Sequence, residues 1–322
     1  MGIVGARFAL DIIDGHLAGN YGTAAAVFDP NVSLIEKYEP IFLKKNVYVF
    51  RDYRKFVKCG IKAVAISSGA DRVGYVVKAL RNRLDVLCEP PMAMNIDELD
   101  RIERAVRDSG RRYVLASYQC HRRETLLAEK LYRRGDIGKL LYAEGNELVE
   151  DIPDIPVNLQ SAGSIGQVLK ATALHPERVK SSKILSRNVS IGIEELEFAS
   201  GAVCRALNAS VGVSSGMRLI GEWGVIETGR GKVVLTDNSG IFPKITSYHP
   251  EGFMLDGMIN GAEFSRSSAI AGFCAMLAGS SSAADRCIAI DRALDMSIAA
   301  RSFPSKSEVA PERSFGINIE HK

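Results

Sequence analysis

Short apolar runs alternate with amphipathic helical patterns over the first 118 residues, and this alternation restricts the chain to very few folds. The runs show little exchange of polar and apolar residues, as expected for strands that are covered on both faces. They are Gly2–Gly5, Thr23–Asp29, Asn46–Phe50, Ala63–Ser67, Asp85–Glu89 and Arg112–Ser117. Strands joined through helices require right-handed crossovers. We therefore predict an α/β domain over residues 1–118, built on a doubly wound parallel sheet.

Two of the helical patterns are clear enough to place. In Asp71–Asn82 and in Ile96–Ser109 the apolar residues recur at helical spacing. The second segment also carries signals at both ends, because Asn95 can cap its first turn, Glu98 follows three residues later and Gly110 comes after its last turn. We predict that this helix begins and ends at these residues.

Strands follow one another in the second part of the chain, after a predicted helix over Glu124–Arg134. The expected strands are Leu140–Val149, Glu194–Ala199, Val203–Val211, Arg218–Ile220, Val225–Glu227 and Lys232–Leu235. The expected turns are Ser200-Gly201, Ser215-Gly216 and Gly229-Arg230-Gly231. Consecutive strands with tight turns predict an antiparallel sheet. We predict a second, α+β domain over residues 119–322, with a loop at Ser280–Ser282 and a last helix over Asp285–Ser302.

Composition and charge exclude several classes of protein. The chain has 322 residues, 46% of them apolar, and a formal net charge of +3, which gives no reason to expect a polyanion as partner. The Arg-rich stretch 101–134 mixes both signs, so we predict no nucleic-acid binding. The sequence has no run of about 18 apolar residues and no secretory signal at its start. Together with six dispersed cysteines, this predicts a soluble, cytoplasmic protein without a membrane segment.

The turn after the first strand is where a dinucleotide-binding domain holds a pyrophosphate. Glycines there allow close approach of the backbone, and the N-terminus of the next helix is partially positive. In the G-x-G-x-x-G pattern Gly5 fits the first position, whereas Arg7 and Leu10 replace the other two glycines. The bulk of Arg7 could close the phosphate site, or its guanidinium could pair with a phosphate. Asp29 ends the second strand where an acid would bind a ribose diol, with a turn or helix-capping carboxylate as the alternative.

A more specific resemblance begins at Val86–Ala93, which reads V-L-C-E-P-P-M-A. This segment resembles the V-x-C-E-K-P-x-A segment of the Gfo/Idh/MocA family, the relatives of glucose–fructose oxidoreductase and inositol dehydrogenase. Tyr118–Arg123 and Gly135–Lys139 are similar to the family's entry into its second domain, and Gly221–Glu227 is similar to one of its strand pairs. The likeness implies a Rossmann-type domain followed by an α+β substrate domain.

The resemblance also implies a function and a cofactor. It implies an NAD(P)-dependent oxidoreductase that acts on a small polar substrate, either a sugar derivative or an imine, and that forms a homo-oligomer. Asp29 would repel the 2′-phosphate of NADP, so NAD is the expected cofactor and NADP the alternative. The residues expected to bind the cofactor are Gly5, Arg7, Phe8, Asp29, Ser67, Glu89 and Pro90.

Only some of the family's proton-transfer groups are present. Pro90 stands in place of the E-K-P lysine, and the D-x-G-x-H segment keeps its histidine, His175, but has Ala171 in place of the aspartate. His175 is the first catalytic candidate, since the ordinary pKa of histidine lies near neutrality. Tyr118 and His121, which follow the last strand of the first domain, are the other two. The sequence has no cluster with metal-ligand spacing, so no metal is expected.

Two functions therefore remain open. The changes at Arg7, Pro90 and Ala171 also fit a catalytically silent relative that acts as a ligand sensor or scaffold subunit. The thiazolinyl imine reductases, which resemble this family, likewise lack the E-K-P lysine, carry a basic residue at the position of Arg7 and have a tyrosine at that of Tyr118. This likeness favours cofactor binding in spite of Arg7.

Overall fold

The computed structural model describes residues 1–14, 23–67, 71–148, 162–185, 189–211, 214–249, 261–279, 288–289, 293 and 318–320. The chain forms two compact units. The first consists of Met1–Ala116 and Arg266–Leu294, and the second of Ser117–Ser265 and Asp295–Lys322. The division after Ala116 lies close to the boundary expected at residue 118, whereas the return of a late segment to the first unit has no counterpart in the sequence pattern.

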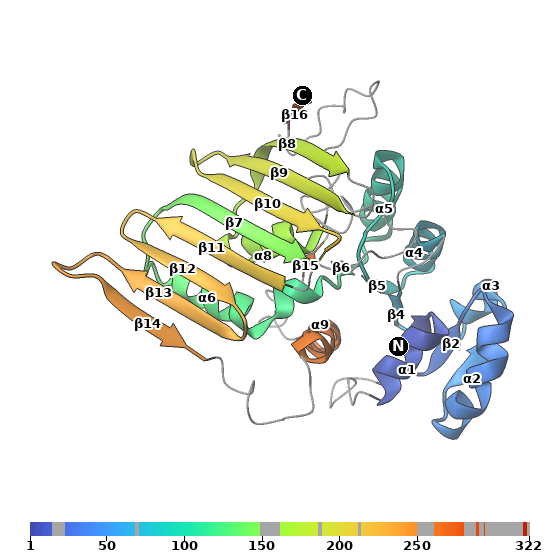
Figure 1. Cartoon of the computed structure of the whole chain (residues 1–322). Helices are drawn as coiled ribbons and strands as arrows, with labels where there is room; N and C mark the ends of the chain where they lie inside the picture. The colour runs from blue at the N-terminus through green and yellow to red at the C-terminus, as the bar shows by residue number, and fades with distance from the viewer. Residues whose placement is uncertain are drawn as a thin grey trace. The chain divides into compact units, whose positions relative to one another are not determined.

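The first unit is an α/β unit with a seven-stranded sheet in the order β15-β6-β5-β4-β1-β2-β3 (Figure 1). Six strands are parallel and β15 is antiparallel to β6, which confirms the predicted doubly wound sheet. The strands are β1 (Gly2–Val4), β2 (Ala26–Phe28), β3 (Tyr48–Phe50), β4 (Ala63–Ile66), β5 (Asp85–Cys88), β6 (Tyr113–Leu115) and β15 (Ile288–Ala289). The helices are α1 (Ala6–Asp14), α2 (Val32–Lys44), α3 (Tyr53–Phe56), α4 (Arg72–Arg81) and α5 (Ile96–Ser109).

The ends of α5 confirm the prediction made from local sequence. The Asn95 side chain accepts the backbone N–H of Glu98 at 2.9 Å, and the Glu98 carboxylate accepts the N–H of Met94 at 2.6 Å. Gly110 follows the last turn in the left-handed conformation, with φ +63°, where glycine carries no steric penalty. These signals act within one or two turns, so the sequence contains all the information they need.

The predicted last helix, Asp285–Ser302, is wrong at Ile288 and Ala289, whereas Ala293 is helical as predicted. Ile288 and Ala289 form strand β15, which pairs with Leu115 and Val114 of β6, while most of the predicted segment lies outside the described residues. An apolar pair can be buried by a sheet edge as well as by a helix face, and hydrophobic spacing does not distinguish the two over so short a segment. A second contact involves α9 (Gly261–Leu277), since the Arg112 guanidinium donates to the carbonyl of Met276 at 3.1 Å.

The second unit is an α+β unit with a nine-stranded sheet in the order β14-β13-β12-β11-β7-β10-β9-β8-β16. All neighbouring pairs are antiparallel except β10–β7 and β16–β8, as the mostly antiparallel prediction requires. The strands are β7 (Leu140–Leu148), β8 (Pro176–Leu185), β9 (Ser190–Phe198), β10 (Val203–Ala209), β11 (Ser214–Gly221), β12 (Gly224–Gly229), β13 (Lys232–Asp237), β14 (Lys244–Tyr248) and β16 (Asn318–Glu320). Its helices are η1 (Tyr118–His121), α6 (Arg123–Arg133) and α8 (Ala162–Thr172), and α9 (Gly261–Leu277) crosses the division between the units.

One of the three predicted turns is wrong. Turns follow β9 at Ser200-Gly201 and join β12 to β13 at Gly229–Gly231, as predicted, but Ser215 and Gly216 lie inside β11. A Cβ at Gly216 would come within 2.6 Å of the carbonyl oxygen of Thr228. This glycine therefore serves a close approach between strands and not a turn. The predicted loop at Ser280–Ser282 lies outside the described residues.

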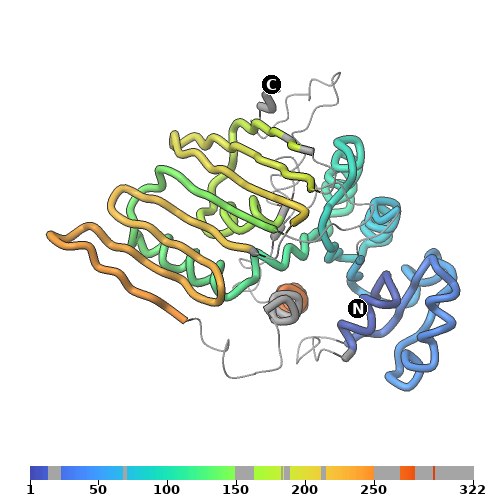
Figure 2. Tube along the Cα trace, in the orientation of Figure 1, coloured from blue at the N-terminus to red at the C-terminus, as the bar shows by residue number. Residues whose placement is uncertain are grey.

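Helices α6 and α8 cover one face of the nine-stranded sheet, and in the described part of this unit no helix covers the other face (Figure 1). Figure 2 shows β7 between β11 and β10, although β8 and β9 separate β7 from β10 in the sequence. The covered face is called the inner face below, and the other the open face. Within the described ranges, no helix has the length and apolar character needed to cross a bilayer.

Candidate functional site

Four parallel strands of the first unit end side by side and bring the predicted cofactor residues to one edge of the sheet. Strand β1 lies between β2 and β4, and β4 pairs with β5. Gly5 follows β1 with φ +109°, and a Cβ at this position would collide with the hydroxyl of Ser67, which follows β4. Only glycine satisfies both the backbone angle and the close approach. The edge where strands end and helices begin is the usual ligand position in such sheets.

Asp29 joins the end of β2 to the start of α1. Its Oδ2 accepts the N–H of Ala6, the first residue of α1, at 2.7 Å, and its Oδ1 accepts the N–H of Asn31 at 2.8 Å. The carboxylate is 8% exposed. Asp29 therefore caps the helix, which was the alternative considered from sequence. Each carboxylate oxygen keeps a second lone pair, so capping leaves acceptor sites for ribose hydroxyls.

Arg7 and Phe8 occupy the first turn of α1 but point to different surroundings. Arg7, at the second glycine position of the pattern, is exposed. Phe8 is 6% exposed and belongs to the core, so it can approach a ligand only through its backbone. The first amides of a helix have no intrahelical acceptor, and the Arg7 and Phe8 amides belong to this group.

The segment after β5 is held by a buried cation that the sequence interpretation missed. The N–H of Glu89 donates to the carbonyl of Ile66 at 2.9 Å, and the Pro90-Pro91 peptide bond is cis. Arg72, the first residue of α4, is buried and donates from its guanidinium to the carbonyl of Pro91. In the sequence Arg72 resembles any charged residue of an amphipathic helix, and only its packing shows that it orders the Glu89–Pro91 segment.

Tyr118 and His121 lie on η1, at the start of the second unit. Tyr118 is half-buried and His121 is 2% exposed. The segment packs against α6 and α8, and the Thr125 hydroxyl donates to the carbonyl of Gln119 at 2.9 Å. Of the two predicted catalytic groups here, Tyr118 is the more accessible.

His175 lies three residues beyond the end of α8 and is exposed. Ala171, which is expected from sequence to replace an aspartate, is 1% exposed and packs in the core. Ala173 takes the left-handed conformation with φ +56°, which a non-glycine residue adopts at some cost. Within the described ranges, no three His, Cys, Asp or Glu side chains form a group that could hold a metal ion.

A buried carboxyl on the inner face, Glu147 of β7, was not predicted. It is 4% exposed and accepts a hydrogen bond from the side-chain amide of Gln119, the neighbour of Tyr118. Burial raises the pKa of Glu147 to about 7, while Gln119, the charge of Arg122 and the Ser164 N–H act in the opposite direction. In sequence this residue is one polar position in the strand pattern Leu140–Val149, and nothing local marks it as buried.

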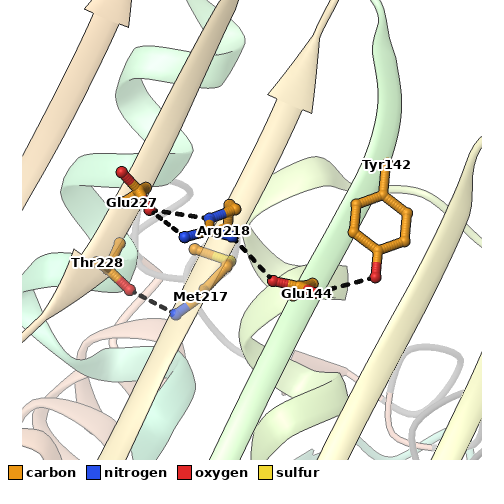
Figure 3. A network of polar contacts seen from close by, with 6 residues as sticks. All are labelled: Tyr142, Glu144, Met217, Arg218, Glu227 and Thr228. Atoms are coloured by element: carbon orange, nitrogen blue, oxygen red, sulfur yellow. Dashed lines mark hydrogen bonds and ion pairs between the residues drawn. The ribbon is translucent and has the colours of Figure 1, made fainter.

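The open face of the same sheet carries a network of charged side chains (Figure 3). The Arg218 guanidinium contacts the carboxylates of Glu227 at 2.7 Å and Glu144 at 3.5 Å, and the Tyr142 hydroxyl donates to Glu144 at 3.0 Å. Beside them, the Thr228 hydroxyl accepts the backbone N–H of Met217 at 2.9 Å. This face is therefore polar and ordered by cross-strand pairs.

Comparison with known protein families agrees with the geometry of the first unit. A parallel sheet with a glycine and an acidic residue at the carboxyl ends of neighbouring strands is typical of dinucleotide-binding domains. Residues 1–117 match the Gfo/Idh/MocA family, described as an oxidoreductase family with an NAD-binding Rossmann fold. The match covers the first domain, residues 1–117. Curated protein sequences give no match.

Solved structures share the fold. An oxidoreductase from Agrobacterium radiobacter in complex with NAD+, L-tartaric acid and magnesium gives a TM-score of 0.78 at 10% identity and covers 94% of each chain. A levoglucosan dehydrogenase in complex with NADH and L-sorbose gives 0.73 at 16% identity, covering 93% of this chain and 95% of that one. An inositol dehydrogenase homologue from Azotobacter vinelandii with NADH and myo-inositol gives 0.72 at 15%, covering 93% and 92%.

Proposed function

We propose that this chain is an NAD-dependent oxidoreductase that transfers hydride to or from a small polar substrate with sugar-like hydroxyl groups. The observation that carries the proposal is the placement of Gly5, Asp29 and Ser67 at the ends of adjacent parallel strands, in the domain that matches an NAD-binding family. The relatives solved with NAD+ or NADH and a hydroxylated molecule support the substrate class.

The strand-end residues fit a dinucleotide. Gly5 leaves room for the backbone to approach a phosphate, and the exposed Arg7 guanidinium can pair with it. Asp29 has acceptor sites for ribose hydroxyls, and its negative charge disfavours the 2′-phosphate of NADP. Ser67, Glu89 and Pro90 complete the proposed cofactor edge. When bound, NAD supplies the carbon that accepts or returns the hydride.

His175 and Tyr118 are the proposed proton-transfer groups. Oxidation of an alcohol removes a hydride from carbon and a proton from oxygen, so the protein must supply a base for that proton and return it in the reverse reaction. Pro90 has no titratable group and Ala171 only a buried methyl, so neither can act as the base. His121 is the third proposed group, although it is buried.

A catalytically silent relative is the second candidate function. The packing of Ala171 in the core favours it, because it removes a carboxylate without placing another in its position. The two candidates differ in one measurement, the absorbance change of NADH at 340 nm with polyols and sugar derivatives as substrates. Binding of NAD without any hydride transfer across such a panel supports the silent relative, and transfer to any member excludes it.

Substitution of Arg7 shows whether its side chain binds the pyrophosphate or obstructs the NAD site. If the guanidinium pairs with the pyrophosphate, as we propose, Arg7→Ala weakens NAD binding about 10- to 150-fold through loss of a charge-assisted contact of about 1.5–3 kcal/mol. Isothermal calorimetry with NAD measures the change, and Arg54→Ala, at an exposed arginine of α3, serves as control. Tighter binding by Arg7→Gly and Arg7→Ala would show instead that the side chain obstructs the site.

The open face supports a homo-oligomer. Six side chains form one row across six neighbouring strands, each the register partner of the next. In order they are Glu227, Arg218, Glu144, Arg205, Glu195 and Lys180. The signs alternate, and the parallel row beside it contains Val203, Tyr142 and Ile220.

This row is complementary to itself. A two-fold axis parallel to the strands and midway between β7 and β10 reverses the row in a second copy. Glu144 then faces Arg205, Arg218 faces Glu195 and Glu227 faces Lys180, so every charge meets the opposite sign. Isologous contacts of this kind are typical of two-fold dimers, and we propose a dimer through the open face.

Arg218→Glu tests the dimer, because it places like charges against each other in both copies. Light scattering is expected to give twice 35.0 kDa for the wild type and the monomer mass for the variant at micromolar concentration. Arg54→Glu makes the same charge change in the first unit and should leave the mass unchanged. A monomeric wild type would contradict the proposed dimer.

A further inference from the structure

A row of polar side chains crosses the inner face beneath α8, where a sheet normally presents apolar residues. Glu147 of β7 is the register partner of Ser215 in β11 and of Asn208 in β10. Glu194 lies on the next strand, β9, opposite Ser181 of β8. Four of these residues are at most 9% exposed, and Glu194 is fully buried. On β10 the register partner of Glu194 is Ala206, which pairs with Gly145 of β7, so the two buried carboxyl groups lie in neighbouring rows.

Hydrogen bonds connect this row to the first turn of α8. The Ser164 hydroxyl donates to Oδ1 of Asn208 at 2.8 Å, and the Asn208 amide donates to Glu194 at 3.0 Å. A Cβ at Gly163 would collide with the carboxyl group of Glu147, so glycine at that position makes room for the acid. The Glu147 carboxyl therefore lies directly against the helix start.

Glu147 also holds η1. The Gln119 side chain donates to Oε1 of Glu147, and Gln119 is the residue next to Tyr118. Oε2 of Glu147 is buried and has no hydrogen-bond partner within the described ranges. One carboxyl group thus joins three elements: η1, β7 and α8.

The charges around Glu147 are already engaged elsewhere. Arg122 contacts Glu124 at 3.4 Å, and Lys170, farther along α8, pairs with Glu129 at 3.2 Å. The other buried titratable groups of the surrounding elements include Cys120 and His121 on η1, Cys204 on β10 and Glu194 on β9. A carboxylate at Glu147 would be desolvated without an ion pair of its own, which makes the neutral acid the cheaper form.

We propose that Glu147 is a positioning residue that holds η1, and with it Tyr118, against the start of α8, and that it does so best in its neutral form. The consequence for catalysis rests on the proposed function, in which Tyr118 handles a proton. Burial raises the pKa of Glu147 from 4.5 to about 7. Between pH 4.5 and about pH 7, the closed state, in which η1 packs against α8, therefore retains a proton that the open state, in which this contact is broken, has lost. The stability of the closed state falls as pH rises through this window and is lowest above the folded pKa.

Hydrogen exchange measured by mass spectrometry tests this hold without cofactor or substrate. In the wild type, protection of peptides covering residues 118–121 and 162–166 is expected to fall about tenfold between pH 6 and pH 8, after correction for intrinsic exchange. Glu147→Gln, which keeps a neutral acceptor at the same place, should show equal protection at both pH values. Glu177→Gln, at an exposed carboxylate of β8, should behave like the wild type.

A second variant keeps the proposal testable if Glu147→Gln does not fold. Gln119→Met removes the hydrogen bond through which Glu147 holds η1, so protection of residues 118–121 should already be low at pH 6 and change little up to pH 8. The proposal is overturned if Glu147→Gln loses protection as the wild type does, or if the wild type shows no pH dependence. In turnover, a fall of kcat above pH 7 should be present in the wild type and absent from Glu147→Gln. A protein that transfers no hydride contradicts the proposed function, and exchange still decides the role of Glu147.

Discussion

Replacement of His175 by alanine together with Tyr118 by phenylalanine is expected to lower kcat for hydride transfer by about 10²–10⁴-fold, the usual contribution of general acid–base catalysis. These are the two accessible predicted proton-transfer groups, since His121 is 2% exposed and Pro90 and Ala171 carry no titratable side chain. Steady-state NADH absorbance with a substrate found in the panel above measures the change, and NAD titration checks that cofactor binding persists.

The single variants His175→Ala and Tyr118→Phe show which of the two groups transfers the proton. The variant with the larger loss of kcat identifies the group that carries the proton, whereas equal losses that do not add indicate a shared relay. His249→Ala and Tyr48→Phe change exposed residues of the same types and should leave kcat unaltered. A double variant that keeps more than a tenth of wild-type kcat would assign the proton transfer to another group.

Gly145→Ala is expected to destabilise the second unit by about 1–3 kcal/mol, the range for overpacking a close contact. A Cβ at this position of β7 would collide with the carbonyl oxygen of Ser164 in α8. Backbone atoms cannot rotate away as a flexible side chain can, so the helix must move off the sheet. Urea unfolding followed by circular dichroism measures the loss.

Gly240→Ala is the matched control, because its Cβ would meet no atom closer than 3.8 Å. Since α8 leads directly to His175, displacement of the helix by Gly145→Ala should also lower kcat. An unfolding midpoint equal to that of the control would show that strand and helix are farther apart in solution than in this structure.

Much of the fold could be predicted from short-range patterns. The helix Ile96–Ser109 needed only Asn95, Glu98 and Gly110, whose contacts lie within a turn of the helix. The six parallel strands followed from apolar runs between helices, because sheets covered on both faces use such runs. In each case the physical signal lies within about twenty residues of the element that it determines.

The errors arise where distant segments meet. Ser215-Gly216 has the composition of a turn, yet Gly216 allows Thr228 of the neighbouring strand to approach. Ile288 and Ala289 belong to a segment whose apolar spacing predicts a helix, but they add an antiparallel strand to β6. Both outcomes depend on a neighbour that the local sequence does not specify.

The sequence by itself determined the two kinds of sheet and the residues that follow the parallel strands, from Gly5 to Glu89. The expectation that Pro90 and Ala171 replace proton-transfer groups also came from the sequence, through its resemblance to a family. Only the tertiary structure decided that Asp29 caps α1 and that Glu147 is buried against α8. The sequence shows that a carboxyl group is present but not whether it is buried or what it contacts. Its charge, partners and pKa depend on which surfaces exclude water around it, and here those surfaces come from elements far apart in the chain.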